Sequence, residues 1–204
     1  MGLVVTTEPS IEPVTLADAK LHLRQDETAD DTLISGLISA ARRQVEAFLR
    51  RPLITTRYRW TLDGFLRSRV PCQDLNSLIL RTPVGGVRSV TSIGYRDVSN
   101  LPQTLDPANY SVDVSEQPAR IAPGYSISWP ATFPQMGSVT IEFVAGYGDN
   151  AADVPADIIA ALKLILGHLY ENREATMMQY PIAEIPMGAE HLLWPHRVHV
   201  VGQS

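Results

Sequence analysis

The spacing of hydrophobic residues changes twice along the chain. From Leu33 to Leu49 apolar residues recur at steps of one, three and four, the spacing of one face of an α-helix. From Ile54 to Tyr147 they alternate with polar residues, which is typical of β-strands. The helical spacing returns from Ile158 to Tyr170. The pattern therefore predicts a strand-rich segment between two helical ones.

Local signals set the ends of two N-terminal helices. Thr15 can cap a helix, with Asp18 among the free amide groups of its first turn, and this helix should reach about Leu23. A second helix should follow Asp30 and Asp31 and stop at Pro52. In it, Glu46 and Arg50 have the i,i+4 spacing of an ion pair.

The middle segment contains short alternating runs separated by turn residues. The clearest runs are Tyr58–Leu62, Val87–Tyr95, Tyr110–Val114 and Val139–Val144, and the breaks include Gly85-Gly86, Pro107–Asn109 and Pro123-Gly124. We predict five to seven short strands packed as a small sandwich or barrel.

The third helix, which starts near Pro155, is apolar on more than one side and should be buried against the two N-terminal helices. The predicted fold class is therefore α+β: a small helical bundle, an inserted β-rich sandwich or barrel-like module, and a C-terminal docking tail. The predicted boundaries are 1–53 and 151–175 for the helical core, 54–150 for the β-rich domain and 176–204 for the tail.

The tail differs from the rest of the chain. Thr176–Pro186 has the composition of a linker, and Gly188–Trp194 could form one or two helical turns before Pro195. So short a helix is not stable alone. Its Leu192, Leu193 and Trp194 must be covered by the chain's own core or by a neighbouring subunit.

Composition narrows the function classes. The chain has 204 residues, of which 45% are hydrophobic, enough for a substantial core. Its 17 basic and 22 acidic residues give a net charge of −5, without the basic field that sequence-independent DNA binding needs. The single cysteine, Cys72, allows no internal disulfide. Residues 1–10 lack the layout of a signal peptide, and no apolar run is long enough to span a membrane, so we expect assembly in the cytoplasm and no membrane partner.

Candidate chemical sites are weak. His191, His196 and His199 lie close together, but no helical i,i+4 histidine pair accompanies them, and a docking tail explains them better than a metal site. Gly146–Asp149 lacks the spacing and lysine of a phosphate loop, and the chain has no G-x-S-x-G motif. Glu171 and Glu174 are interpreted as polar contacts at a helix end. We predict no catalytic residue, no metal and no cofactor: the protein is not an enzyme.

Six arginines within eighteen positions could instead contact DNA or an acidic partner. They are Arg42, Arg43, Arg50, Arg51, Arg57 and Arg59. The favoured interpretation is that they complement a helix end and solvate one face of a strand.

Both helical ends resemble the phage head-tail connector (adaptor, or head-completion) family, including its versions in phage-like gene transfer particles. The residues that carry the resemblance are Thr15–Asp18 with Lys20, Asp30–Ile34, Ala40–Phe48, Pro155–Ile158, Leu169–Glu174 and Pro186–Leu193 leading to Arg197-Val198. It is a likeness of order and pattern rather than of a chemical motif.

The resemblance implies an adaptor subunit in the particle neck. Its expected partners are the portal protein, neighbouring copies in a ring of about twelve, a tail-side neck or stopper protein, and DNA that passes through the channel without specific binding. A short helix with an aromatic residue is a typical anchor for a partner's groove. The predicted portal-docking residues are His191, Leu192, Leu193, Trp194, Arg197 and Val198.

Two alternatives remain. The chain could be a tail-side completion or stopper protein, which would associate with a different component. It could also be a binding module whose strand domain holds a ligand or glycan, in which case Trp60, Tyr95 or Trp129 would form an exposed, concave aromatic patch.

Overall fold

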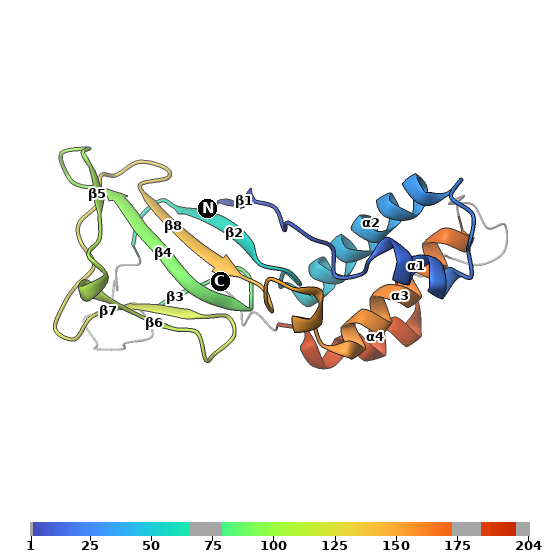
Figure 1. The fold of residues 1–204 in the computed structure, drawn as a ribbon. Helices are drawn as coiled ribbons and strands as arrows, with labels where there is room; N and C mark the ends of the chain where they lie inside the picture. Colours follow the sequence, from blue (N-terminus) through green and yellow to red (C-terminus); the bar gives the residue numbers. More distant parts are fainter. Residues whose placement is uncertain (1, 66–78, 173–184, 199–204) are drawn as a thin grey trace, which may run out of the picture. The chain divides into compact units, whose positions relative to one another are not determined.

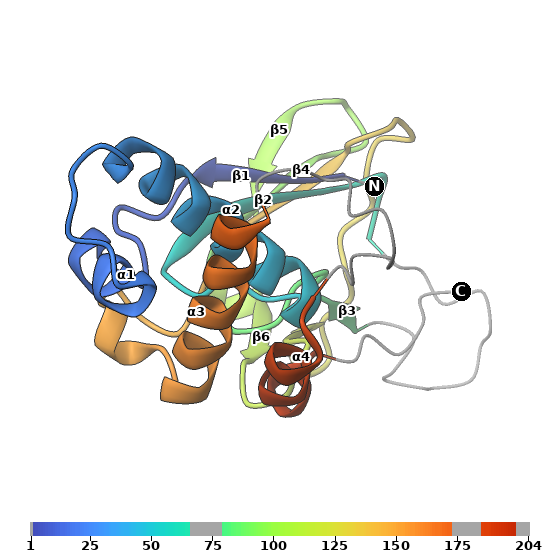
Figure 2. The same ribbon diagram turned by 90° about the vertical axis from the view of Figure 1, so that its right-hand side faces the viewer.

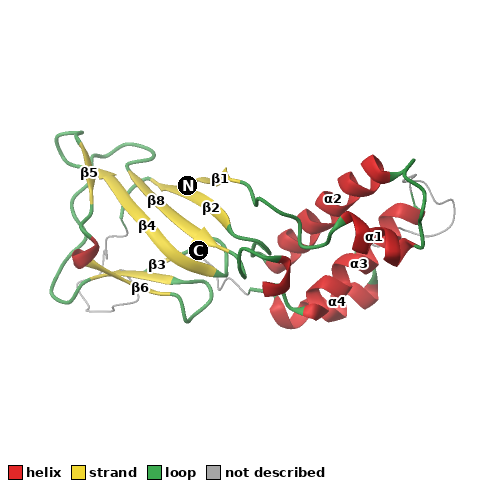
Figure 3. Ribbon diagram, viewed as in Figure 1, coloured by secondary structure: helices red, strands yellow, loops and turns green. Residues whose placement is uncertain are grey.

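The computed structural model describes residues 2–65, 79–172 and 185–198 (Figure 1). The chain divides into two compact units. The helical unit comprises Pro9–Ile54 and Tyr147–Arg197, and the strand unit comprises Met1–Glu8, Thr55–Gly146 and Val198–Ser204. All four α-helices belong to the helical unit and all the strands to the strand unit, which also contains a short 3-10 helix at Pro107–Asn109 (Figure 3). The fold class is α+β, as predicted.

The helical unit contains four α-helices among the described residues. They are α1 (Leu16–Leu23), α2 (Asp31–Leu49), α3 (Ala156–Glu171) and α4 (Met187–Leu193), with short 3-10 turns at Ala151–Asp153 and Trp194–His196. Helix α3 contacts the other three, and Figure 2 shows it in the middle of the unit.

The helix ends follow the sequence signals. The Thr15 hydroxyl accepts a hydrogen bond from the Asp18 backbone N–H at 3.1 Å and donates one to the Asp18 carboxylate at 2.7 Å. This exchange satisfies an amide that the helix itself leaves open. Helix α2 ends at Leu49, and the next residue, Arg50, adopts the left-handed conformation with φ of 56°, shortly before Pro52. The predicted bounds of both helices are confirmed.

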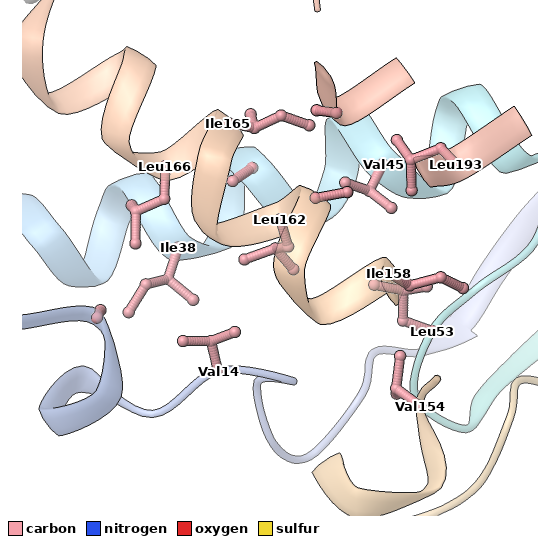
Figure 4. Close-up of a cluster of buried hydrophobic side chains, with 14 of the residues drawn as sticks. Val14, Ile38, Val45, Leu53, Val154, Ile158, Leu162, Ile165, Leu166 and Leu193 are labelled. Atoms are coloured by element: carbon pink, nitrogen blue, oxygen red, sulfur yellow. The ribbon is translucent and has the colours of Figure 1, made fainter. Parts of the chain in front are cut away.

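One aliphatic core holds the helical unit together (Figure 4). Its buried residues come from all four helices and from the loops beside them: Val14, Ala19, Ile34, Ile38, Ala41, Val45, Leu49, Leu53, Ile54, Val154, Ile158, Ala161, Leu162, Ile165, Leu166, Tyr170, Ala189 and Leu193. Segments from opposite ends of the sequence therefore share one core. The predicted packing of the third helix against the first two is confirmed.

The strand unit contains two antiparallel sheets. Its strands are β1 (Gly2–Thr7), β2 (Thr56–Leu62), β3 (Leu80–Arg81), β4 (Val87–Arg96), β5 (Pro102–Thr104), β6 (Tyr110–Asp113), β7 (Arg120–Pro123) and β8 (Val139–Ala145). The larger sheet has the order β1-β2-β8-β4-β5 and the smaller one β3-β7-β6 (Figure 1).

Alternation along the strands directs one face of the larger sheet to the core. Trp60 pairs with Ile141 and Tyr58 with Phe143, on the buried face, whereas Arg59 and Glu142 point the other way. Leu80 and Ile121 from the smaller sheet join the same buried cluster. The two sheets thus contribute to a single core.

The unit boundaries differ from the predicted ones at both ends of the chain. Residues 2–7 were assigned to the helical core, but they form β1 and pair with β2. Residues 187–193 were assigned to a separate tail, but as α4 they pack on α3 and α2. In both cases a contact between residues far apart in sequence decides the assignment.

Candidate interaction surface

Helix α4 has one buried face and one exposed face. Ala189 and Leu193, four positions apart, are fully buried in the helical core, and Figure 4 shows Leu193 among the core side chains beside Val45. Met187, His191 and Trp194 follow the spacing i, i+4, i+7 and are exposed. The helix therefore anchors itself with one face and presents the other.

Three of the six predicted docking residues are used by the chain itself. Leu193 is fully buried, and Leu192 packs partly buried against the helical core. Val198 is buried in the strand unit, so close to Gly85 that a β-carbon added there would lie 2.3 Å from a Val198 methyl group. In this conformation Leu193 and Val198 cannot contact a partner, because the chain's own packing covers them.

The exposed face of α4 is extended by an aromatic cluster. The Trp194 ring, half exposed at 50%, lies 6.4 Å from the Phe48 ring. The Arg197 guanidinium lies over both rings, 4.9 Å from the Phe48 centroid and 5.5 Å from the Trp194 centroid. These contacts hold the indole in one orientation. We call Met187, His191, Trp194 and Arg197 the α4 surface.

Helical periodicity within residues 187–194 alone could have separated the two faces. The predicted docking residues include Leu192, Leu193 and Trp194 alike and omit Met187, the most exposed of the four at 76%. The spacing of four between Ala189 and Leu193 indicates the buried face.

His196 fastens the segment after α4 to α3. Its Nε2 lies 2.5 Å from a carboxylate oxygen of Asp157, in the first turn of α3. This hydrogen bond, with smaller help from the Ile158 N–H, lowers the pKa of Asp157 below its usual value. His196 thus has a structural partner, and no group of three metal-binding side chains occurs in the described ranges. His199 lies outside them.

The arginines do not form one basic field. The Arg42 side chain is buried and pairs with Glu12 at 2.8 Å and Glu46 at 2.9 Å. Arg51 lies over the Tyr147 ring, 4.2 Å from its centroid. Arg59 pairs with Glu142 across the strands at 2.9 Å. Several of the six therefore stabilise the chain itself.

Glu46 bonds differently from the predicted i,i+4 pair. It accepts from Arg42, one turn earlier, and from the Leu53 backbone N–H at 2.9 Å, rather than pairing with Arg50. Arg50 occupies the left-handed position that ends α2. Burial raises the pKa of Glu46, although Leu53 and Arg42 act in the opposite direction.

The aromatic residues proposed for a ligand patch are packed instead. Trp60 is buried in the core of the strand unit. Trp129 stacks on Phe65 with centroids 4.7 Å apart, and Tyr95 meets the edge of the same ring at 6.0 Å. The exposed concave patch that a ligand-binding module requires is not formed by these residues.

Gly146–Asp149 forms a turn from β8 into the helical unit. Gly146 has a φ of 136°, and a β-carbon on Gly148 would lie 2.0 Å from the Asp153 carboxylate. Asp153 in turn accepts from the Asn150 N–H at 3.0 Å. Both glycines are therefore explained by the turn, as predicted. Cys72 and Glu174 lie outside the described residues, and no helix described here is long and apolar enough to cross a membrane.

Comparison with protein families gives one match. A model described as "Phage gp6-like head-tail connector protein" matches residues 13–113. The chain belongs to the phage head-tail connector family. The match to this connector begins just before α1 and continues through β6. No curated protein matches it significantly.

Solved structures match the connector over its whole length. A chain in "Virion of native gene transfer agent (GTA) particle" has a TM-score of 0.77 and 22% identity. Chains in "Neck of empty GTA particle computed with C6 symmetry" and "Neck of native GTA particle computed with C12 symmetry" have TM-scores of 0.76 and 0.69, each with 21% identity. Each match covers 100% of this chain and 99% of the other. The connector therefore shares both units of its fold with these chains.

Proposed function

We propose that this connector is an adaptor subunit of the neck of a phage or phage-like particle, where a ring of copies binds the portal and joins head to tail around the DNA channel. The observation that carries the proposal is the fold match, from end to end, to chains in gene transfer agent necks. Family membership supports the same role independently, because it rests on sequence. The matching family is described as a connector and not as an enzyme, and this supports a structural role.

We further propose that the α4 surface docks on the portal. Met187, His191 and Trp194 form one exposed stripe, the arrangement by which a helix lies in a partner's groove. Trp194 is already oriented by Phe48 and Arg197, so little side-chain entropy is lost on binding. Tryptophan and arginine are enriched among residues that dominate interface energies.

The net charge of −5 suits a channel subunit. A ring that held DNA tightly would need several Lys and Arg contacts to phosphates. In the connector, Arg42 and Arg59 are engaged with carboxylates of the same chain. We therefore propose that DNA passes the ring without specific binding.

The test is attachment of the full chain to portal-bearing heads. Trp194→Ala combined with Met187→Glu should lower the affinity by at least about tenfold, since removing one interface hot spot costs about 2 kcal/mol. Tyr125→Ala is the matched control, because Tyr125 is a fully exposed aromatic residue of the strand unit. Circular dichroism would check that both variants are folded. Unchanged binding of the double variant would contradict docking through α4.

The same experiment distinguishes a tail-side stopper. An adaptor should co-sediment with isolated heads, whereas a stopper should co-sediment with isolated tails. Binding only to tails would overturn the proposed position, and cryo-electron microscopy of the neck would show the copy number directly.

A further inference from the structure

The two margins of the five-stranded sheet are built differently. At one margin, β5 has three residues and begins with Pro102, which lacks a backbone N–H. Short strands and proline are common means of keeping a sheet edge from pairing with another chain. At the other margin, β1 has six residues, Gly2–Thr7, without proline or charge. One edge of the sheet is blunted and the other is not.

The side chains of β1 are also uncovered. Leu3, Val4 and Val5 are exposed to 38%, 60% and 38%. Leu3 lies opposite Trp60 and Val5 opposite Tyr58, so these two continue the core face of the sheet, and Val4 lies on the other face opposite Arg59. A β-bulge after Val5 leaves residues 2–5 as the regular part. This is an apolar edge whose outward backbone groups have no strand beside them among the described residues (Figure 1).

We propose that β1 is the contact between neighbouring copies, with its open edge receiving an extended segment of the next copy; this rests on the proposed ring. An edge strand pairs with another strand, because only extended backbone presents donors and acceptors at the matching spacing. In a ring the contact is heterologous, so β1 of one copy meets a different segment of the next.

The proposed ring makes a second copy the occupant, because each copy in a closed ring meets a neighbour on two different faces. Each copy carries a net charge of −5, so two copies repel on average. The β1 edge carries no charged side chain; of the two arginines of β2 that lie opposite it, Arg59 pairs with Glu142 and Arg57 is exposed. It is therefore a place where two acidic chains can approach without like-charge contact. The repetition of the contact around a ring would compensate for its small size.

The experiment uses the full chain in purified particles. A photo-reactive benzophenone amino acid replaces Val4 in one variant and Gln103, in the blunted edge β5, in the matched control. After irradiation, the position 4 variant should give a band at twice the mass of the chain, at least about fivefold stronger than the control. Peptide mapping should join β1 to a different segment of the second copy.

Several outcomes would overturn the inference. They are a crosslink from position 4 only to another protein, a crosslink joining β1 to β1, or no crosslink in particles whose neck contains the chain. Absence of the chain from the neck would instead refute the proposed function, so the two failures can be told apart.

A second measurement does not depend on crosslinking. Val4→Lys places a charge on the open edge, a common way to block strand pairing. It should reduce the number of particles with a complete ring by about tenfold, whereas Gln103→Lys should leave it unchanged. Equal particle yields from the two variants would contradict the proposal.

Discussion

The two units differ in how completely they cover their own apolar residues. The helical unit draws its core from both ends of the sequence. Apart from the α4 surface, each of its helices exposes one large apolar side chain among the described residues: Leu21, Leu33 and Leu164. The strand unit leaves a whole strand uncovered, and its loops expose further residues: Val98, Leu101, Tyr125 and Met136. The helical unit is thus nearly closed by itself, and the strand unit is not.

This difference follows from how each element satisfies its backbone. A helix makes most of its backbone hydrogen bonds within itself, so only its apolar face needs to be covered by another element. In the helical unit, α2 and α3 cover part of each other's apolar face. An open sheet has two margins with unpaired donors and acceptors. In the described part of the chain, β5 at one margin is short and begins with Pro102, whereas β1 at the other has no strand beside it. Contacts with other proteins are therefore to be sought at α4 in one unit and at β1 in the other.

The largest effect is expected from a cavity in the core of the strand unit. Phe143 is buried and stacks on Tyr58 at 5.4 Å. Phe143→Ala should cost about 3–5 kcal/mol, through lost burial and the cavity left behind. Hydrogen exchange should speed up in β2 and β8 but not in α3, because the two buried clusters have no residue in common in the described part of the chain. Equal acceleration in both units would show that they unfold as one.

Two leucines on α3, one buried and one exposed, test which face of this helix contributes to the core of the helical unit. Leu162 is 0% exposed and Leu164 is 42% exposed, two positions apart on the same helix. Leu162→Ala should lower the free energy of unfolding by about 2–5 kcal/mol, whereas Leu164→Ala should lower it by about 1 kcal/mol or less. Urea denaturation measures both. Equal losses would mean that α3 is buried on both faces.

The smallest expected effect concerns the hydrogen bond between Asp157 and His196, which joins α3 to the segment after α4. His196 lowers the pKa of Asp157, so the folded state favours the ionised carboxylate. The stability gained is present above the usual pKa of 3.8 and is lost as the pH falls through the lowered value. Because Asp157 is partly exposed, the gain should stay below about 1 kcal/mol.

Replacing this carboxyl removes the dependence on pH. Asp157→Asn should be less stable than the unmodified chain near neutral pH, and the difference should shrink in acid. Urea titrations at several pH values would measure it, with Asp26→Asn, at an exposed site, as the control. A difference that stays constant with pH would exclude this linkage.

Much of the fold was predictable because its signals are local. Thr15 and Asp18 fix the start of α1, and the spacing from Leu33 to Leu49 fixes α2. Alternation found four of the strands, and the apolar surface of α3 implied its burial. The candidate site was only partly predictable. Docking through the C-terminal segment stays a prediction, and two of the residues predicted for it, Leu193 and Val198, are buried by the folded chain.

The order of helical and strand segments, and the caps and breaks between them, follow from the sequence alone. These depend on neighbours a few positions apart, where the periods 3.6 and 2 act directly. The pairing of residues 2–7 with β2 and the packing of α4 on α3 and α2 are evident only in the folded structure. β1 pairs with residues at least fifty positions away. Helix α4 packs on α3 and on the far more distant α2, and no local pattern specifies such partners.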